Sequence, residues 1–218
     1  MAIGRHPQWN DLDLSDFVKD AALVVIDPTN GVLHKDGAQS GDGLWRRARA
    51  EDGSLGKILQ LVGLARNRDF PVAWLRYEYL RQHYPATALD TAQYDYWYQN
   101  RRWTPDQKAW EGALIDEIAA VRRDGDLDSV YTSFGNVFLG SPLLATLNTW
   151  RARTLLICGY HMDHCVEQAA RTARDFGFLP LVVGDCSCAS DPADEEPTLR
   201  RIDANWAPVV QLADLVGD

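Results

Sequence analysis

The sequence predicts an α/β fold: a doubly wound sheet of about six parallel strands with helices on both faces. Short apolar runs alternate with longer amphipathic stretches along the 218 residues, which is typical of strands and helices that alternate in a parallel sheet. With 46% hydrophobic residues, the chain is able to bury a full core. We expect one domain over residues 1–218.

The expected elements follow one another from the N-terminus. The expected strands lie at 21–26 (AALVVI), 70–75, 127–132, 153–158, 178–183 and, from a weaker pattern, 208–212. The expected helices lie at 54–67, 105–122, 141–150, 163–176 and 194–204. Ser54 and the pair Thr104 and Pro105 supply helix starts, because a hydroxyl caps free amides and proline suits the first turn.

Charge and composition argue against several classes of protein. The 22 basic and 31 acidic residues give a net charge of −9, which repels phosphate backbones and anionic membranes. No apolar run approaches the roughly 18 residues of a membrane helix, and the first residues lack the apolar core of a signal peptide. We therefore expect a cytoplasmic protein that binds neither nucleic acid nor membrane. Its four cysteines are too few for a secreted disulfide framework and should be free thiols.

The residues that directly follow the apolar runs are the candidates for function. In open parallel sheets, ligands bind beyond the carboxyl ends of the strands. Asp27 and Asn30 follow the first run, Thr132 ends the third, and the segment GYHMDHC (159–165) follows the fourth. The sequence therefore predicts that Asp27 and Cys165 share one edge of the sheet.

Cys165 lies where the helix expected at 163–176 begins. Free amides and the positive end of a helix dipole favour a thiolate, so we expect a lowered pKa for this thiol. The same amides would stabilise the oxyanion that forms when a thiol attacks a carbonyl. Asp27 ends a strongly apolar strand, where desolvation raises a carboxyl pKa toward that of a general base. Position alone leaves the alternative open that Cys165 only packs and Asp27 only caps a helix.

Two segments resemble the isochorismatase-like cysteine hydrolases. ALVVIDPTNGVL resembles that family's first strand and turn, and GYHMDHCVEQAARTARDFGFLPLVVGDCSCA resembles its cysteine turn, the next helix and the next strand. The resemblance implies a Rossmann-like fold in which Asp27 is the base and Cys165 the nucleophile. It also implies a cis peptide between Tyr160 and His161, so that the amides of His161 and Cys165 form the oxyanion hole.

The family's third catalytic residue, a lysine after the third strand, has no counterpart in the sequence. VYTSFGNVFLGSPL aligns with the family's Phe-x-Gly segment and places Thr132 at the lysine position, and no lysine follows Lys108. Threonine forms hydrogen bonds but supplies no positive charge. Three consequences stay open: Arg101 or Arg102 replaces the cation, the chemistry differs from amide cleavage, or the protein binds a ligand without turning it over.

Aromatic residues gather in the long segment after the second expected strand. Six of the eight tyrosines lie between Tyr77 and Tyr98, close to two tryptophans and a pair of arginines. Such residues are favoured at binding surfaces, so the segment is either a wall over the substrate or a subunit interface. The predicted substrate contacts are Asn30, Tyr77, Trp97, Arg101, Arg102 and Tyr160.

We expect a hydrolase that cleaves a C–N bond of a small amide, ureido or related compound through a thioester. Its catalytic residues would be Asp27, Cys165 and, in an atypical triad, Thr132. His161, His164 and Cys165 are possible metal ligands, but the adjacent side chains of His164 and Cys165 diverge by about 100° on a helix. We therefore expect no metal at this site, and the reaction needs no cofactor. One alternative is a vinyl ether hydrolase in which Asp27, not the thiol, acts; another is a non-catalytic ligand-binding or assembly protein. The resemblance implies a homodimer or homotetramer.

Overall fold

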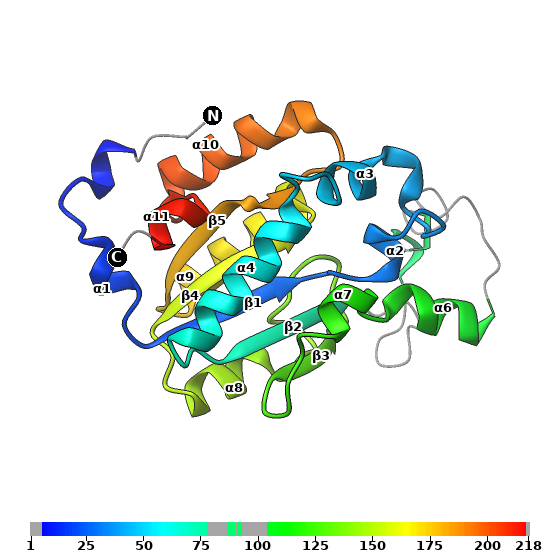
Figure 1. Ribbon diagram of the computed structural model, residues 1–218, viewed down its shortest axis with the longest axis horizontal. Helices are drawn as coiled ribbons and strands as arrows, with labels where there is room; N and C mark the ends of the chain where they lie inside the picture. Colours follow the sequence, from blue (N-terminus) through cyan, green and yellow to red (C-terminus); the bar gives the residue numbers. More distant parts are fainter. Residues whose placement is uncertain (1–5, 78–86, 90, 93–103, 217–218) are drawn as a thin grey trace.

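The computed structural model describes residues 6–77, 87–89, 91–92 and 104–216, which fold around a six-stranded parallel sheet (Figure 1). The strands are β1 (Ala21–Ile26), β2 (Val72–Tyr77), β3 (Leu127–Tyr131), β4 (Thr154–Tyr160), β5 (Leu179–Cys188) and β6 (Val209–Val210). Their order in the sheet is β3-β2-β1-β4-β5-β6. The chain runs outward from β1 to one edge and then from β4 to the other, so the predicted doubly wound sheet is confirmed.

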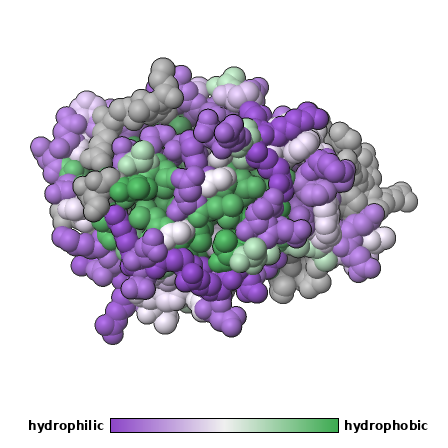
Figure 2. Space-filling model, viewed as in Figure 1, coloured by the Kyte–Doolittle hydropathy of each residue, from purple (hydrophilic) through white to green (hydrophobic). Residues whose placement is uncertain are grey.

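Helices cover both faces of this sheet. They are α1 (Leu14–Phe17), α2 (Asn30–Leu33), α3 (Leu44–Ala48), α4 (Ser54–Asn67), α6 (Pro105–Gly112), α7 (Asp116–Ala119), α8 (Leu143–Thr149), α9 (Glu167–Asp175), α10 (Glu195–Asn205) and α11 (Leu212–Val216). In the described part of the chain, none of them has the length and apolar character needed to cross a bilayer. Apolar side chains gather in the middle of one face, over α4 and α11, inside a polar border (Figure 2).

Alternate residues of β1 point into two separate cores. Leu23 and Val25 pack in the core that α3, α4 and α11 cover, whereas Val24 and Ile26 pack in the core that α8, α9 and α10 cover. All six residues of the strand are buried. A central parallel strand has helices on both faces, which explains why AALVVI is apolar throughout.

Several boundaries differ from the expected ones. The helix expected over 105–122 breaks into α6 and α7, because the intervening chain extends to pair with the segment after β1: the amide of Ile115 donates to the Pro28 carbonyl at 3.0 Å. β5 continues through Cys188, past an irregularity in its pairing with β4. The helix expected from 163 begins as a wide turn, Met162–Val166, before α9. The last expected strand shortens to two residues, and α11 starts at its end.

The two predicted helix starts have different outcomes. Thr104 begins α6 with a reciprocal capping box, as expected. Ser54 is not a cap, because Gly53 holds that position. The Ser54 hydroxyl instead lies 2.9 Å from Oη of Tyr160 and 3.2 Å from Sγ of Cys188. All four cysteines are free and buried, which confirms the expected free thiols.

Candidate active site

Asp27 directly follows β1 and turns a carboxyl group inward at the carboxyl edge of the sheet. Its amide still donates to the Leu75 carbonyl of β2 at 2.8 Å, so its backbone belongs to the sheet. Its φ is 52°, in the left-handed region that aspartate enters more readily than most residues. Only 5% of the residue is exposed. The end of β1 therefore holds a buried carboxyl group in a fixed position.

Three side chains from three different elements form a continuous chain of polar contacts. The amide of Tyr77 donates to Oδ1 of Asp27 at 2.7 Å, and the hydroxyl of Tyr131 donates to Oδ2 at 2.5 Å. The same hydroxyl lies 3.3 Å from Sγ of Cys165. The ends of β1 and β3 and the turn after β4 thus bring a carboxyl, a phenol and a thiol together. The predicted meeting of Asp27 and Cys165 at one edge is confirmed.

The environment of Asp27 shifts its pKa to the neutral range. Burial raises the pKa of the carboxyl group from 3.8 to about 7, although hydrogen bonds from Tyr131, the Tyr77 amide and Cys165 act in the opposite direction. A carboxyl group with a pKa near neutral pH exchanges protons readily, which suits a general acid or base.

The predicted lowering of the Cys165 thiol pKa is wrong. Burial and the neighbouring Asp27 carboxyl raise this pKa, and hydrogen bonds from Tyr131 and the His161 amide only partly oppose them. The residue is 9% exposed, so the sulfur loses most of the solvation that a thiolate needs. Burial beside a carboxyl group raises the thiol pKa by more than the start of the helix lowers it. The thiol is therefore protonated at neutral pH.

The turn after β4 contains the cis peptide that the resemblance implied. The peptide bond between Tyr160 and His161 is cis, as expected. Against burial, which raises the thiol pKa of Cys165, a hydrogen bond from the backbone amide of His161 lowers it, so this amide is directed toward the sulfur. The side chain of Tyr160 packs on the opposite face of the sheet, in the core beneath α4. The predicted substrate contact through Tyr160 is therefore wrong.

Tyr131, and not Thr132, lies between Asp27 and Cys165. Neighbouring residues at the end of a strand point to opposite sides. The Thr132 side chain lies against Gly140, where a Cβ would meet its hydroxyl oxygen at 1.8 Å. Thr132 is absent from the lining of the cavity beside the thiol. The family pattern therefore pointed to Thr132, the neighbour of the residue whose hydroxyl contacts both Asp27 and Cys165.

The remaining predicted substrate contacts differ in their placement. Tyr77 lines the cavity beside Cys165. Asn30 does not: its Nδ2 donates to the Trp110 carbonyl at 3.0 Å and ties α2 to α6, so this prediction is wrong. Three more predicted contacts lie outside the described residues, namely Trp97, Arg101 and Arg102.

A cavity of about 630 Å³ opens over the thiol. Asp27, Tyr131 and Cys165 contribute to its wall, together with the turn after β4 and the segment 38–42. Sequence reasoning missed this segment, because it has neither periodicity nor a recognisable motif and lies in the connection between α2 and α3. The volume is sufficient for a small organic molecule beside the sulfur.

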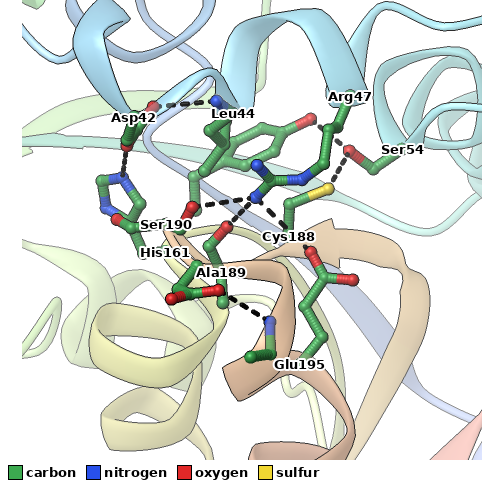
Figure 3. Close-up of polar contacts among 12 residues, drawn as sticks. Asp42, Leu44, Arg47, Ser54, His161, Cys188, Ala189, Ser190 and Glu195 are labelled. Atoms are coloured by element: carbon green, nitrogen blue, oxygen red, sulfur yellow. Dashed lines mark hydrogen bonds and ion pairs between the residues drawn. The ribbon is translucent and has the colours of Figure 1, made fainter.

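Polar contacts of Arg47 brace the wall of this cavity from the side of α3 (Figure 3). Its Nη2 donates to the carbonyl oxygens of Ala189 and Ser190, the latter at 3.0 Å, and lies 3.7 Å from Oε1 of Glu195. The guanidinium therefore links α3 to the segment between β5 and α10. Ser190 also lines the cavity, so the link holds one side of the site in place.

Comparisons with known proteins identify the family of the chain and agree with its fold. Residues 21–214 match the family model of the isochorismatase domain. An isochorismatase family protein from Desulfovibrio vulgaris superposes with a TM-score of 0.72 at 20% identity, over 90% of this chain and 96% of that one. A cysteine hydrolase from Pseudomonas syringae pv. phaseolicola gives 0.69 at 18%, over 91% of both chains. N-carbamoylsarcosine amidase from Thermoplasma acidophilum gives 0.66 at 21%, over 88% and 96%.

Proposed function

Because the chain belongs to the isochorismatase family of hydrolases, we propose that it cleaves the C–N bond of a small amide, ureido or related compound through Cys165. The observation that carries this proposal is the contact chain from Asp27 through Tyr131 to Cys165, which opens into a cavity of substrate size. The similarity to an amidase favours amide and ureido substrates over other classes.

The first step is attack by a thiol that loses its proton as it reacts. The ionised Asp27 takes the proton of the Tyr131 hydroxyl while this hydroxyl takes the thiol proton, and the sulfur forms a bond to the carbonyl carbon. Burial holds the pKa of Tyr131 well above its usual value, so the two transfers occur together and no tyrosinate persists. The electron pair of the carbonyl moves to its oxygen, which becomes the oxyanion.

The second half of the reaction returns the proton. The oxyanion collapses, the C–N bond breaks, and the leaving nitrogen takes the proton that Asp27 had gained. A thioester remains on Cys165. Water then attacks the thioester while Asp27 accepts its proton, and the leaving sulfur takes that proton back from Asp27 through the Tyr131 hydroxyl. The sum is an acid, an amine and the regenerated enzyme, with no cofactor in any step.

The charge balance of these steps explains how the site works without the family's lysine. One negative charge is present throughout: it lies on Asp27 before attack and on the oxyanion afterwards. The backbone amides of His161 and Cys165 are the donors that receive it, as in other oxyanion holes. The hydroxyl of Tyr131 holds Asp27 and Cys165 together by hydrogen bonds, which requires no positive charge.

The decisive experiment compares Cys165→Ala and Asp27→Asn with the wild type on a panel of primary amides and ureido compounds. Both variants should lose turnover, and mass spectrometry of the wild type after acid quenching should detect an acyl group on Cys165. Full activity of Cys165→Ala would refute the thioester route.

One observation favours a second candidate, a thiol-independent vinyl ether hydrolase. With a pKa of about 7, Asp27 is protonated in a large fraction of molecules at neutral pH and is able to donate a proton to a substrate. In that reaction Asp27→Asn is inactive while Cys165→Ala keeps its activity. The same two variants therefore separate the two candidates.

A further inference from the structure

The described part of the wall around the cavity over Cys165 carries acidic side chains and no basic partner of the lysine or arginine type. Three carboxyl groups line it, those of Asp27, Asp42 and Asp163, and its described lining includes neither lysine nor arginine. A carboxylate-bearing substrate would meet charges of its own sign in a partly enclosed space, whereas a cation would be attracted. The charge of the wall thus discriminates between classes of amide.

Asp42 is held in a fixed orientation toward the cavity. It ends the turn Ser40–Asp42, and its Oδ1 accepts a hydrogen bond from the amide of Leu44 at 2.8 Å, at the start of α3. Its Oδ2 faces Nε2 of His161 at 3.8 Å, which is beyond hydrogen-bond distance (Figure 3). One oxygen therefore anchors the side chain while the other is directed at the space beside the imidazole.

Asp163 presents an unsatisfied acceptor in the same cavity. Its Oδ1 is buried and has no hydrogen-bond partner among the described residues, and its Oδ2 lies 3.8 Å from Nε2 of His164. Nε2 of His161 is also buried and has no such partner in the described part of the chain. Buried polar atoms are nearly always paired, so these two atoms mark a polar network beside the cavity that the described residues leave incomplete.

Among the described residues, two guanidinium groups near the site are engaged elsewhere and do not balance these carboxylates. Arg47 binds two backbone carbonyls and lies beside Glu195. Arg76 donates to Asp128 at 2.8 Å and to the Gly112 carbonyl at 2.9 Å. Neither guanidinium lines the cavity.

The imidazole of His161 does not balance the Asp42 carboxylate either. Burial lowers the pKa of His161, although Asp42 and Asp163 act in the opposite direction. The imidazole beside Asp42 is therefore neutral at pH 7, and the carboxylate keeps its charge available for a ligand.

We propose that the substrate is an amide or ureido compound that also carries a cationic group, an ammonium or a guanidinium, which Asp42 and Asp163 bind. This proposal rests on the proposed hydrolase function and specifies its substrate class. Cation binding by these two carboxylates places the neutral amide end of the molecule at Cys165, in the same cavity.

The test uses three matched amides: γ-aminobutyramide, γ-hydroxybutyramide and succinamate, together with their shorter and longer homologues. The wild type should give the highest kcat/KM with the ammonium compounds and the lowest with the carboxylates. Asp42→Asn and Asp163→Asn should each reduce the ratio of kcat/KM for ammonium over hydroxyl substrates by about tenfold, the value expected for a hydrogen bond to a charged group. Asparagine keeps the shape of the side chain, and at position 42 also an oxygen that accepts the hydrogen bond from the Leu44 amide.

The matched control is Asp36→Asn, which removes an exposed carboxyl group that pairs with Lys35 outside the cavity. It should leave the ratio unchanged. A preference of the wild type for succinamate, or an equal loss on all three compounds in the two variants, would overturn the charge assignment while the hydrolase function stands. If the wild type cleaves none of them, the hydrolase proposal fails. Titration calorimetry of Cys165→Ala then measures the binding of the same compounds, and tighter binding of the ammonium than of the carboxylate compounds would support the charge assignment.

Discussion

The hydroxyl oxygen of Tyr131 lies 3.3 Å from the sulfur of Cys165 and donates a hydrogen bond to Asp27 at 2.5 Å. A neutral phenol thus bridges a carboxyl group and a thiol at the position where the sequence led us to expect a threonine in place of a lysine. The bridge offers a path for a proton between the two groups, and its hydrogen bonds lower the pKa of both against the burial that raises it. The first prediction therefore concerns this hydroxyl.

Tyr131→Phe should lower kcat/KM by about 100-fold, the lower range for loss of a positioned proton donor and acceptor. The hydroxyl lowers the pKa of Asp27, so its removal should move the acidic limb of the pH profile to higher pH. Steady-state kinetics across pH measure both effects. Thr132→Val is the control and should stay close to the wild type, since its side chain lies against Gly140. A larger loss of activity in Thr132→Val than in Tyr131→Phe would mean that Thr132, and not Tyr131, is the third catalytic residue.

The pH dependence of wild-type activity follows from the ionisation of Asp27. The base acts only when it is deprotonated, and its pKa is raised by burial to about 7. kcat/KM should therefore rise with pH through about 7 and level off above it. An ordinary carboxyl group titrates near pH 4 and would give a profile that is flat between about pH 5 and 7. Such a profile would show that Asp27 is not the titrating base.

Asp27→Asn should make the protein more stable while it abolishes activity. The folded protein binds a proton at Asp27 up to about pH 7, whereas the unfolded chain releases it near 3.8. The unfolded state thus binds fewer protons across this window, so the free energy of unfolding of the wild type falls as pH rises. Above pH 7 the variant should gain on the order of 4 kcal/mol, and near pH 4 it should gain little. Urea unfolding at both pH values measures this gain, and an equal effect at both would contradict it.

Cys165 should react slowly with iodoacetamide at neutral pH. Its thiol pKa is raised by burial and by Asp27, so little thiolate is present. The rate should increase with pH, and Cys165 should still be the first of the four thiols to react, because the cavity opens over it. Peptide mapping after timed quenching identifies the labelled position. Rapid labelling at pH 7 would mean that a cation lowers the thiol pKa after all.

Gly159→Ala should destabilise the fold by about 3 kcal/mol or more, in the range for a buried steric clash at a special backbone conformation. Gly159 has a φ of 121°, and an added Cβ would meet the Ile26 carbonyl oxygen at 2.2 Å, where β4 pairs with β1. Gly63→Ala is the control, because it places a methyl group in open space on α4 and should stabilise by a few tenths to about 1 kcal/mol. Thermal and urea unfolding of both variants measure these changes.

The sequence predicted most reliably the elements that are buried on both faces or regularly amphipathic. β1 and α4 begin and end at the predicted residues, because six consecutive buried positions and a clear helical stripe leave no alternative. The rule that ligands bind at the carboxyl edge then placed Asp27 and Cys165 together. Both inferences use only local patterns: the order of apolar residues within a segment and the residues that directly follow it.

The rest of the site depends on contacts between residues far apart in the sequence, which no local pattern predicts. A tyrosine in a strand usually packs in the core, so nothing marked Tyr131, and an error of one residue in alignment reverses the face of a side chain. Asp42 reaches the cavity only through the packing of an irregular segment. The raised pKa of Cys165 follows from burial, which outweighs the helix start and is not visible in the sequence.

Tyr160 and His161 are adjacent in the chain, but the Tyr160 side chain is buried in the core beneath α4, whereas the His161 side chain lines the cavity over Cys165. Tyr160 is secured from beneath by the Ser54 hydroxyl of α4, while the next amide faces the reacting thiol. Substitutions in the core beneath α4 are therefore expected to displace that amide, although they lie outside the cavity wall. The interior of α4 is thus a place, besides the cavity wall, in which to seek variants with an altered site.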